Sequence, residues 1–265
     1  MAESKSRVAL VTGGMGGLGE AICIKLAALG DKVVTTHSPG NTKADEWLAN
    51  MKRQGFSFTA YPCDVADWES SAACVKKVSE AIGPIDVLVN NAGITRDMTF
   101  KKMDKANWDM VLKTNLDSCF NMTKQVCDGM AERGWGRIVN VCSSSGKRPS
   151  LSNAAYSVTK AAQLSLSRVF ADAYAARGVL VNAVTPGPVD TPLWLEEGGL
   201  ADQAAERGGV TREQALEAAR KKIPLGRFGS EDEVAAVVAF LCSEQASNVT
   251  GAAWSVDGGS VPVII

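Results

Sequence analysis

The sequence contains a single histidine, His37, and only three tyrosines among its 265 residues. One histidine cannot supply the cluster of imidazoles found in most catalytic zinc sites, and a serine hydrolase would have to use it as its base. The seven cysteines form no C-x-x-C pair and lie within segments expected to be helices and strands. We therefore expect buried, reduced thiols and no metal site.

Neither sign of charge predominates, since 28 lysines and arginines face 29 aspartates and glutamates that are scattered along the chain. Such a balance predicts no binding to nucleic acid or to an anionic membrane surface. No apolar run approaches about 18 residues, and residues 1–14 lack the pattern of a signal peptide. We expect a cytoplasmic protein whose partners are small molecules or further copies of the same chain.

The 46% hydrophobic content is enough for one large domain with a sizeable core. Short β-rich runs alternate with longer amphipathic segments, which indicates right-handed βαβ crossovers and a parallel sheet covered on both faces. The expected strands are residues 8–13, 32–37, 56–65, 85–93, 136–144, 179–187 and 251–259, and the expected helices lie near 18–30, 41–54, 67–82, 104–133, 154–177 and 231–243. The pattern predicts a single doubly wound α/β domain of the Rossmann type over residues 1–265, with about seven parallel strands between helices.

One segment, residues 192–222, interrupts this alternation between the sixth and seventh expected strands. It carries two Gly-Gly steps and two short helical stretches in a polar sequence. Open α/β sheets bind ligands at the carboxyl ends of their strands, where this segment would begin. We interpret it as a lid over the binding site; a surface excursion is the alternative.

Five of the seven residues from Gly13 to Gly19 are glycine, directly after the first expected strand and at the start of a helix. Glycine lets backbone N–H groups and the helix N-terminus approach a pyrophosphate without a Cβ in the way. A merely tight turn does not need so many glycines, each of which costs conformational entropy. The loop therefore predicts a dinucleotide-binding turn.

Tyr156 and Lys160 are four residues apart in an expected helix, a spacing that places a phenol and an ammonium on one helical face. An ammonium about 4 Å from a phenol stabilises the phenolate by up to ~4 kcal/mol at an effective dielectric of ~20. The pair is thus a candidate proton donor. The same spacing also arises by chance on solvated helices, so the pair alone does not establish a site.

Further motifs occur in a fixed order along the chain. They are Thr12–Gly19, Asp64 in CDV, Asn90–Gly93, Asn115 in KTNLD, Ser143 in VCSSSG, Asn153–Lys160, and Pro186–Gly187 followed by Thr191. Together they resemble the short-chain dehydrogenase/reductase family over essentially the whole chain. The resemblance implies an NAD(P)-dependent enzyme that acts on a CH–OH or C=O group. A non-catalytic dinucleotide-binding or scaffold protein is the alternative, against which the intact Ser143, Tyr156 and Lys160 argue.

The resemblance implies that four residues carry the proton transfer. Tyr156 would donate the proton to the carbonyl oxygen, and Ser143 would hydrogen-bond the same oxygen. Lys160 would make the phenol a stronger acid and hold the nicotinamide ribose, while Asn115 would position a water that relays protons to the lysine. Such donors are needed because hydride addition builds negative charge on oxygen. Taken singly, Ser143 and Asn115 would be capping or turn residues.

The resemblance also assigns residues to cofactor binding, with Asp64 beside the adenine and Thr191 at the carboxamide or a phosphate. The set is Gly13, Met15, Gly17, Leu18, Gly19, His37, Ser38, Asp64, Val65, Asn91, Ala92, Gly93, Tyr156, Lys160, Pro186, Gly187, Val189 and Thr191. Asn90, at the end of an expected strand, is expected to be structural.

The choice between NAD and NADP depends on residues 35–38, at the end of the second expected strand. A carboxylate there would bond the ribose 2′-hydroxyl and repel a 2′-phosphate, and none is present. His37, Ser38, Asn41 and Lys43 offer donors to a phosphate. The basic residue that many NADP-dependent relatives carry in the glycine loop is absent. We predict NADP(H), and NAD(H) stays open.

Within the family, the N-terminal half is most similar to acetoacetyl-CoA reductases of the polyhydroxyalkanoate pathway, in the segments TGGMGGLG, NNAGITRD and DGMAERGWGRIVNV. The resemblance predicts reduction of a 3-oxoacyl thioester such as acetoacetyl-CoA by NADPH; an NAD-dependent dehydrogenase of a secondary alcohol or small ketone is the alternative. Asp97 and Lys102 would border the acyl-CoA entrance or form a solvated pair. The residues expected to face the substrate are Ser150, Leu151, Asn153 and Pro188, where the chain departs from those relatives, and Trp194, which would form an apolar wall or pack the lid.

The expected helices 104–133 and 154–177 carry apolar residues on more than one face, which is typical of helices that pack against another subunit. Because members of the family often form tetramers through these helices, the resemblance implies a homotetramer. The apolar C-terminal segment, ending in Ile264 and Ile265, is a further candidate for a contact with a neighbour.

Overall fold

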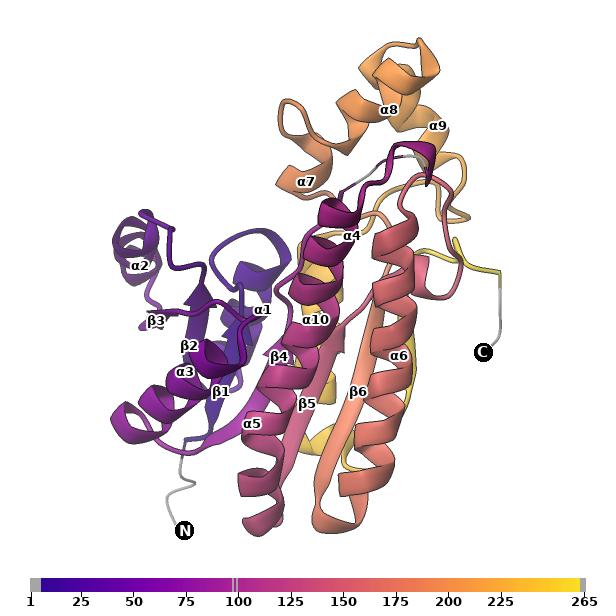
Figure 1. Cartoon of the computed structure of the whole chain (residues 1–265). Helices are drawn as coiled ribbons and strands as arrows, with labels where there is room; N and C mark the ends of the chain where they lie inside the picture. Colours follow the sequence, from indigo (N-terminus) through magenta and orange to yellow (C-terminus); the bar gives the residue numbers. More distant parts are fainter. Residues whose placement is uncertain (1–5, 97, 99, 263–265) are drawn as a thin grey trace.

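Seven parallel strands form one sheet in the order β3-β2-β1-β4-β5-β6-β7 (Figure 1). The computed structural model describes residues 6–96, 98 and 100–262. The strands are β1 (Val8–Thr12), β2 (Lys32–His37), β3 (Thr59–Pro62), β4 (Ile85–Asn90), β5 (Gly136–Val141), β6 (Val179–Pro186) and β7 (Ala253–Val256). The strand order reverses direction between β1 and β4, which defines a doubly wound sheet. The predicted fold class is confirmed.

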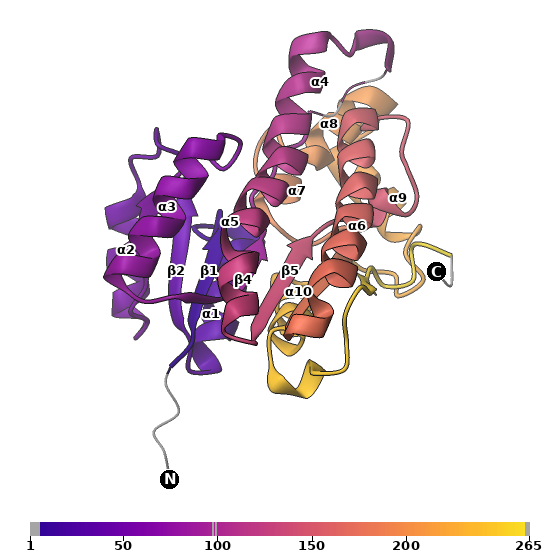
Figure 2. The same ribbon diagram turned by 60° about the horizontal axis from the view of Figure 1, so that its bottom comes forward.

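Helices cover both faces of the sheet, with α3, α5 and α6 on one face and α1 and α10 on the other (Figures 1 and 2). The helices are α1 (Gly17–Ala28), α2 (Ala44–Arg53), α3 (Trp68–Ala81), α4 (Lys105–Leu112), α5 (Ser118–Glu132), α6 (Ala154–Tyr174), α7 (Pro192–Leu195), α8 (Leu200–Gly208), α9 (Arg212–Arg220) and α10 (Glu231–Leu241). None of the described helices is long and apolar enough to cross a membrane.

The core lies in two layers because successive side chains of a strand point to opposite faces. In β1, Val8 and Leu10 pack under α3 and α5, whereas Ala9 and Val11 pack under α1 and α10. All five residues of β1 are buried. Burial of each valine or leucine side chain contributes roughly 1.5–3 kcal/mol, so the central strand is held from both sides.

The predicted strands 56–65 and 251–259 are longer than the strands that form. At the first, Asp64 N donates to Ser70 Oγ at 2.9 Å instead of to a neighbouring strand, and the chain turns into α3. At the second, Gly258 and Gly259 have positive φ values of 62° and 84°, which end the extended run.

The helix predicted over 104–133 is not continuous. A π-helical turn, Lys113–Asp117, separates α4 from α5. Such turns widen the helix by one residue and often occur at functional sites. Here the turn buries Asn115 completely against the carboxyl end of the sheet.

Residues 192–220 include three short helices, α7, α8 and α9, at the carboxyl ends of the strands (Figure 1). A small third core joins this segment to the residues that follow it. It contains Ala201 and Leu216 from the segment and Ile223 and Phe228 after it, with Trp194 and Ala219 packed against them. We call residues 192–222 the lid.

Candidate active site

The glycine loop is held in place by β2 and β4. Gly13 N donates to the carbonyl oxygen of Thr36 at 3.1 Å, and Gly14 N donates to Thr35 Oγ1 at 2.8 Å. From β4, Asn91 Nδ2 donates to the carbonyl oxygen of Gly13 at 3.0 Å. Gly13 and Gly17 have positive φ values of 64° and 51°, a conformation that favours glycine. Hydrogen bonds from both sides therefore fix the path of the loop.

Gly19 shows why the loop cannot carry larger side chains. A Cβ added there would lie 2.4 Å from the carbonyl oxygen of Gly13 and 2.8 Å from Asn91 Nδ2. At Gly16, in contrast, a Cβ would meet nothing within 4 Å. The crowding identifies Gly19 as the glycine required for close packing of helix α1 on the loop.

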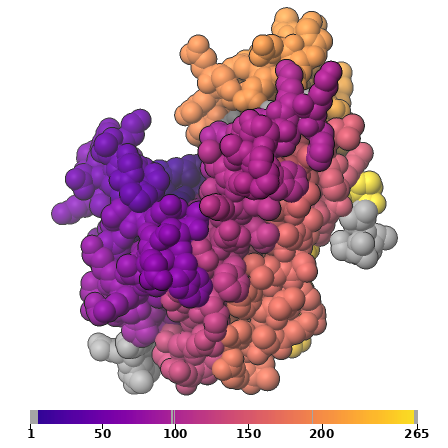
Figure 3. Space-filling model, viewed as in Figure 1, coloured from indigo at the N-terminus to yellow at the C-terminus, as the bar shows by residue number. Residues whose placement is uncertain are grey.

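A groove of ≈ 880 Å³ runs over this loop and the carboxyl ends of β2, β3 and β4. In the space-filling view, a recess lies between α2 and the lid (Figure 3). Twelve of the predicted cofactor residues line the groove: Gly13, Gly17, Leu18, Gly19, His37, Ser38, Asp64, Val65, Asn91, Ala92, Gly93 and Thr191. Met15, also predicted, is not among the lining residues.

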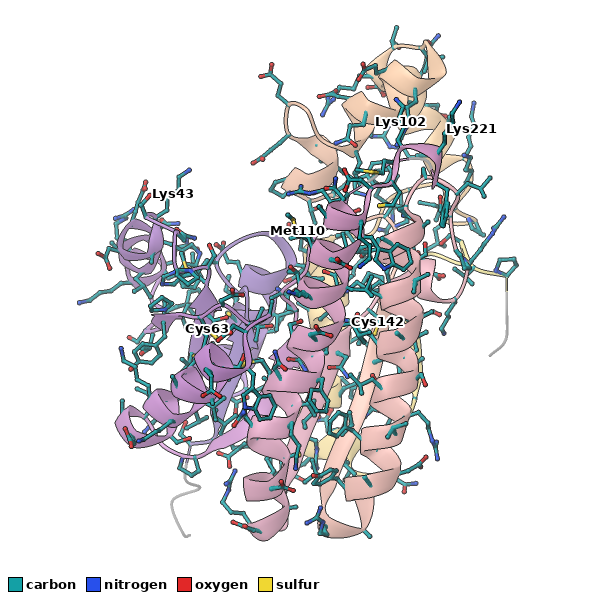
Figure 4. The ribbon with its side chains drawn as sticks, viewed as in Figure 1. Lys43, Cys63, Lys102, Met110, Cys142 and Lys221 are labelled. Atoms are coloured by element: carbon teal, nitrogen blue, oxygen red, sulfur yellow. The ribbon has the colours of Figure 1, made fainter. Side chains whose placement is uncertain are left out.

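The donors predicted for a 2′-phosphate are only partly brought together. His37 and Ser38 line the groove, and His37 Nδ1 lies 2.9 Å from the carbonyl oxygen of Ser38. Asn41 and Lys43 are not among the lining residues; Lys43 N donates to Asn41 Oδ1 at 2.7 Å, and the Lys43 side chain is exposed at the start of α2 (Figure 4). Two of the four predicted residues therefore face the groove.

Asn90 and Asn91 have different tasks at the end of β4. Asn90 Nδ2 donates to Thr123 Oγ1 at 3.0 Å and to Asn140 Oδ1 at 2.8 Å, inside the protein. The structural role expected for Asn90 agrees with these contacts, although the partners are side chains rather than backbone. Asn91 instead joins the strand to the glycine loop.

Tyr156 and Lys160 lie on the first turns of α6 and line a second cavity, of ≈ 520 Å³. The Lys160 ammonium lies 5.4 Å from the centre of the Tyr156 ring. The lysine is 4% exposed, and its Nζ donates to the carbonyl oxygen of Val141 at 2.8 Å. A buried ammonium without this partner would be costly. The predicted pairing on one helical face is present.

Ser143 follows β5 and lines the same cavity. Its Oγ accepts a hydrogen bond from Ser145 N at 3.1 Å, in an N-cap of the short 3₁₀ turn Ser144–Gly146. The alternative reading of Ser143 as a capping residue is thus also true. Because the hydroxyl accepts in that bond, its hydrogen remains available to donate.

Asn115 lies in the π-helical turn and is tied to its surroundings by several hydrogen bonds. Its Oδ1 accepts from Ile94 N at 2.8 Å, and its Nδ2 donates to the carbonyl oxygen of Ile94 at 2.9 Å and to Thr159 Oγ1 at 3.1 Å. Thr159 is the neighbour of Lys160 on α6. Asn115 therefore joins the segment after β4, the π-helical turn and α6.

Only some of the residues predicted to face the substrate line the second cavity. Asn153, Pro188 and Trp194 line the second cavity. Ser150 and Leu151 do not; Ser150 Oγ pairs with Ser152 Oγ at 3.0 Å, and Leu151 is 95% exposed. The turn before α6 that carries these two residues is exposed, outside the lining of the cavity, so their contact with the substrate stays a prediction.

Several lining residues were not anticipated. Ile94, Thr95 and Arg96 follow the predicted NNAG motif, and Leu200 comes from the lid. Thr95 and Arg96 also line a hollow of ≈ 420 Å³ beneath the lid. The only signal in the sequence for Ile94, Thr95 and Arg96 was that they directly follow the NNAG motif at the end of a strand. Asp97 lies outside the described residues, and Lys102 is exposed beyond the cavity (Figure 4).

Pro186, Gly187 and Val189 also line the second cavity. Gly187 N donates to the carbonyl oxygen of Val256 at 3.0 Å, and a Cβ on Gly187 would lie 2.9 Å from Asp257 Cα. Thr191 is at the N-cap of α7 without a side-chain cap bond, so its hydroxyl is not used by that helix.

The groove and the cavity are adjacent, because Leu18, Asn91, Gly93, Ile94 and Thr191 line both. A long ligand in the groove can thus end beside Tyr156 and Lys160. The glycines of the loop have no side chains that would keep a pyrophosphate away from the backbone. The cavity contains a buried ammonium, a phenol and a serine hydroxyl. A Rossmann sheet with this site defines an oxidoreductase that uses a nicotinamide dinucleotide.

The chain belongs to the short-chain dehydrogenase family, whose model matches residues 7–198. An acetoacetyl-CoA reductase of Cupriavidus necator is 43% identical over 96% of this chain and 97% of that protein. Nodulation protein G of Azospirillum brasilense is 42% identical over the same shares of the two chains. Among solved structures, a variant of actinorhodin polyketide ketoreductase with NADPH matches with a TM-score of 0.93 and 35% identity, over 99% of this chain and 100% of that one.

Proposed function

We propose that the enzyme transfers a hydride from NADPH to the ketone of a 3-oxoacyl thioester such as acetoacetyl-CoA. The observation that carries the proposal is the convergence of Ser143, Tyr156 and Lys160 on one cavity that opens into the glycine-lined groove. When bound, the nicotinamide supplies the hydride. The protein supplies the proton and the donors for the oxygen.

Two hydroxyl groups stabilise the charge that develops on the substrate oxygen. The Tyr156 phenol donates a hydrogen bond and then its proton, and the Ser143 hydroxyl donates the second hydrogen bond. Donors that are already in place act without reorganisation at the moment of reaction. The Ser145 N–H orients the Ser143 hydroxyl.

Lys160 positions the cofactor beside Tyr156. An ammonium has three hydrogens, and one of them is used on Val141. The other two can hold ribose hydroxyls at the end of the groove, beside Gly93. The Lys160 ammonium lies 5.4 Å from the centre of the Tyr156 ring, where it can hold the cofactor beside the phenol.

The preference for NADPH is supported by the end of β2. Thr36, His37 and Ser38 line the groove there and carry no negative charge, so nothing at this position repels a 2′-phosphate. A carboxylate at this place is the feature that selects the ribose hydroxyl of NAD. The solved ketoreductase of similar structure is one with NADPH.

The thioester substrate is supported by the relatives and by the cavity. Acetoacetyl-CoA reductases from Cupriavidus necator and Allochromatium vinosum are 43% and 40% identical to the chain. Pro188 and Trp194 give the cavity an apolar wall, which suits a short acyl chain. Trp194 also packs edge-on against Phe228, with ring centres 4.9 Å apart, so the same residue packs the segment after β6 against the body of the protein.

A substrate panel tests the proposal. Initial rates are measured for 3-oxoacyl-CoAs, simple ketones and secondary alcohols, each with NADPH or NADH and their oxidised forms. We expect the highest kcat/KM for acetoacetyl-CoA with NADPH. An equal or higher kcat/KM with NADH would contradict the cofactor, and preferred oxidation of a secondary alcohol would contradict the substrate.

Replacement of the proton donor gives the sharpest single test. We expect Tyr156→Phe to lower kcat by about 10²–10⁴-fold, the usual range for a lost general acid, while the Kd for NADPH stays within twofold. Stopped assays measure the first and fluorescence titration the second. Tyr61→Phe is the control, because Tyr61 lies on β3 and contacts Lys77. Retained turnover in Tyr156→Phe would refute the role.

A further inference from the structure

Gln163 lies close to the reacting residues but belongs to none of the sequence motifs. It is three residues after Lys160 on α6 and is 1% exposed. Its Nε2 donates to the carbonyl oxygen of Asn115 at 2.7 Å and contacts Cys119 Sγ at 3.0 Å. Its Oε1 has no hydrogen-bond partner among the described residues. A buried amide with an unpaired oxygen destabilises the fold, so its presence beside the site requires a reason.

The contact with Asn115 changes what that residue can do. The Asn115 carbonyl oxygen accepts from Gln163 Nε2 at 2.7 Å and also from Ser118 Oγ at 3.2 Å. A carbonyl oxygen has two lone pairs, and both are used here. The water-positioning role predicted for Asn115 therefore cannot use its main-chain oxygen while Gln163 holds it.

Two hydrogen bonds connect the Asn115 side chain to the backbone of Tyr156. Its Nδ2 donates to Thr159 Oγ1, which donates in turn to the carbonyl oxygen of Tyr156 at 2.8 Å. A Cβ added at Gly93 would lie 3.2 Å from Asn115 Oδ1 and 3.8 Å from Lys160 Nζ. The Asn115 side chain and the Lys160 ammonium thus border the same point of the cavity.

We propose that Gln163 is a positioning residue for proton delivery. By holding the Asn115 carbonyl it fixes the π-helical turn, and the turn fixes where the Lys160 ammonium lies relative to the Tyr156 phenol. Loss of the hydrogen bond lets the turn relax and the ammonium move away. Because a more distant ammonium stabilises negative charge on the phenol oxygen less, proton delivery to the substrate slows and the pH dependence of kcat changes. The inference rests on the proposed function only in taking Tyr156 as the acid.

Other titratable groups around Lys160 do not obscure this effect. Burial raises the pKa of Cys119, on α5, to about 11 and that of Cys142, after β5, to about 12 (Figure 4). Both thiols therefore stay neutral from pH 6 to 9.5. The charge of Lys147 acts to lower the pKa of Cys142, against the larger effect of burial. The Lys147 Nζ is itself held by hydrogen bonds to Ala253 O and Ser255 Oγ, both at 3.0 Å.

Gln163→Met tests the proposal, since methionine fills a similar volume without the amide donor. The kcat of NADPH-dependent reduction is measured from pH 6 to 9.5 with the best substrate of the panel. We expect kcat at pH 7 to fall about tenfold and the alkaline limb of the profile to move up by about half a pH unit, which corresponds to under 1 kcal/mol. The Kd for NADPH, from fluorescence, should change less than about twofold.

Ser167→Ala is the matched control. Ser167 is one turn further along α6 and 2% exposed, and it bonds Asn140 and the Gln163 backbone but not Asn115. It should lower the Tm without moving the alkaline limb. The proposal is overturned if the alkaline limb of the kcat profile in Gln163→Met lies at the same pH as in the wild type. It is also overturned if kcat is lowered by the same factor at every pH. If Gln163→Met does not fold, Gln163→Leu is judged by the same criteria. Wild-type turnover on the panel tests the proposed function separately.

Discussion

Lys160 illustrates how single hydrogen bonds prepare this site. Its ammonium is directed by the carbonyl oxygen of Val141, at 2.8 Å. The Ser143 hydroxyl is directed by Ser145 N in the same way. Groups that are already oriented need little rearrangement on binding, which lowers the barrier of the reaction step. The residues beneath the site therefore matter as much as those that touch the substrate.

Gly19→Ala tests the tightness of the glycine loop. The new Cβ would lie 2.4 Å from the carbonyl oxygen of Gly13, so the loop must shift away from its binding conformation. We expect the Kd for NADPH to rise about 100-fold or more, equal to roughly 2.7 kcal/mol, in a protein that keeps its circular dichroism spectrum. Gly40→Ala is the control, because a Cβ there meets nothing within 4 Å. Unchanged affinity in Gly19→Ala would contradict the packing.

Sequence motifs predicted backbone positions at the site better than side-chain directions. Gly13, Asp64 and Gly93 face the groove as expected, since their places follow from strand ends. Leu151 does not face the cavity, because the turn before α6 is shaped by local bonds such as Ser150 N to Ser157 Oγ at 3.2 Å. Bonds of this kind have no sequence period.

At the scale of elements, the π-helical turn and the lid are the two departures from a regular doubly wound fold. Capping explains where the ordinary helices begin: Ser230 and Glu233 form a capping box at α10, and Thr211 and Gln214 form one at α9. Such boxes can be predicted from sequence. The π-helical turn cannot, because its extra residue is set by the tertiary bonds of Asn115.

Leu216→Ala tests whether the lid is a separate packing unit. Leu216 is 3% exposed in the small third core, and a buried Leu→Ala change costs about 2–5 kcal/mol. If the lid opens locally, that loss appears as faster hydrogen exchange over 192–222 and a severalfold higher KM for the thioester, with little change in Tm. Leu10→Ala, in β1, should instead lower the Tm by about 5 °C or more. Equal Tm losses in both variants would contradict a separate lid.

At the scale of the whole molecule, apolar side chains remain exposed on the layer of α3, α5 and α6. Trp68 and Phe120 are 41% and 45% exposed and stack with ring centres 6.1 Å apart, and Val158 and Val169 on α6 are 48% and 61% exposed. Exposed apolar groups on neighbouring helices often mark an interface. We propose that this face joins subunits in a homotetramer. Ile264 and Ile265, the other predicted contact, lie outside the described residues.

Phe120→Glu tests this assembly. A carboxylate at the centre of an apolar interface would be desolvated without a partner, at a cost of several kcal/mol. We expect light scattering to give about four times 27.9 kDa for the wild type and a smaller assembly for the variant. Leu29→Glu, at the end of α1 on the opposite layer, should leave the mass unchanged. A wild-type monomer at micromolar concentration would refute the tetramer.

The end of β2 divides two tasks between adjacent residues. Thr35 and Thr36 hold the glycine loop through Gly14 N and Gly13 N, while His37 and Ser38 face the groove. Coenzyme choice can therefore drift along a mutational path through positions 37 and 38 without loosening the loop. In natural evolution or in laboratory selection, an exchange of NADPH for NADH would need substitutions at only these two positions. The hydrogen bonds of Thr35 and Thr36 to the glycine loop would stay in place.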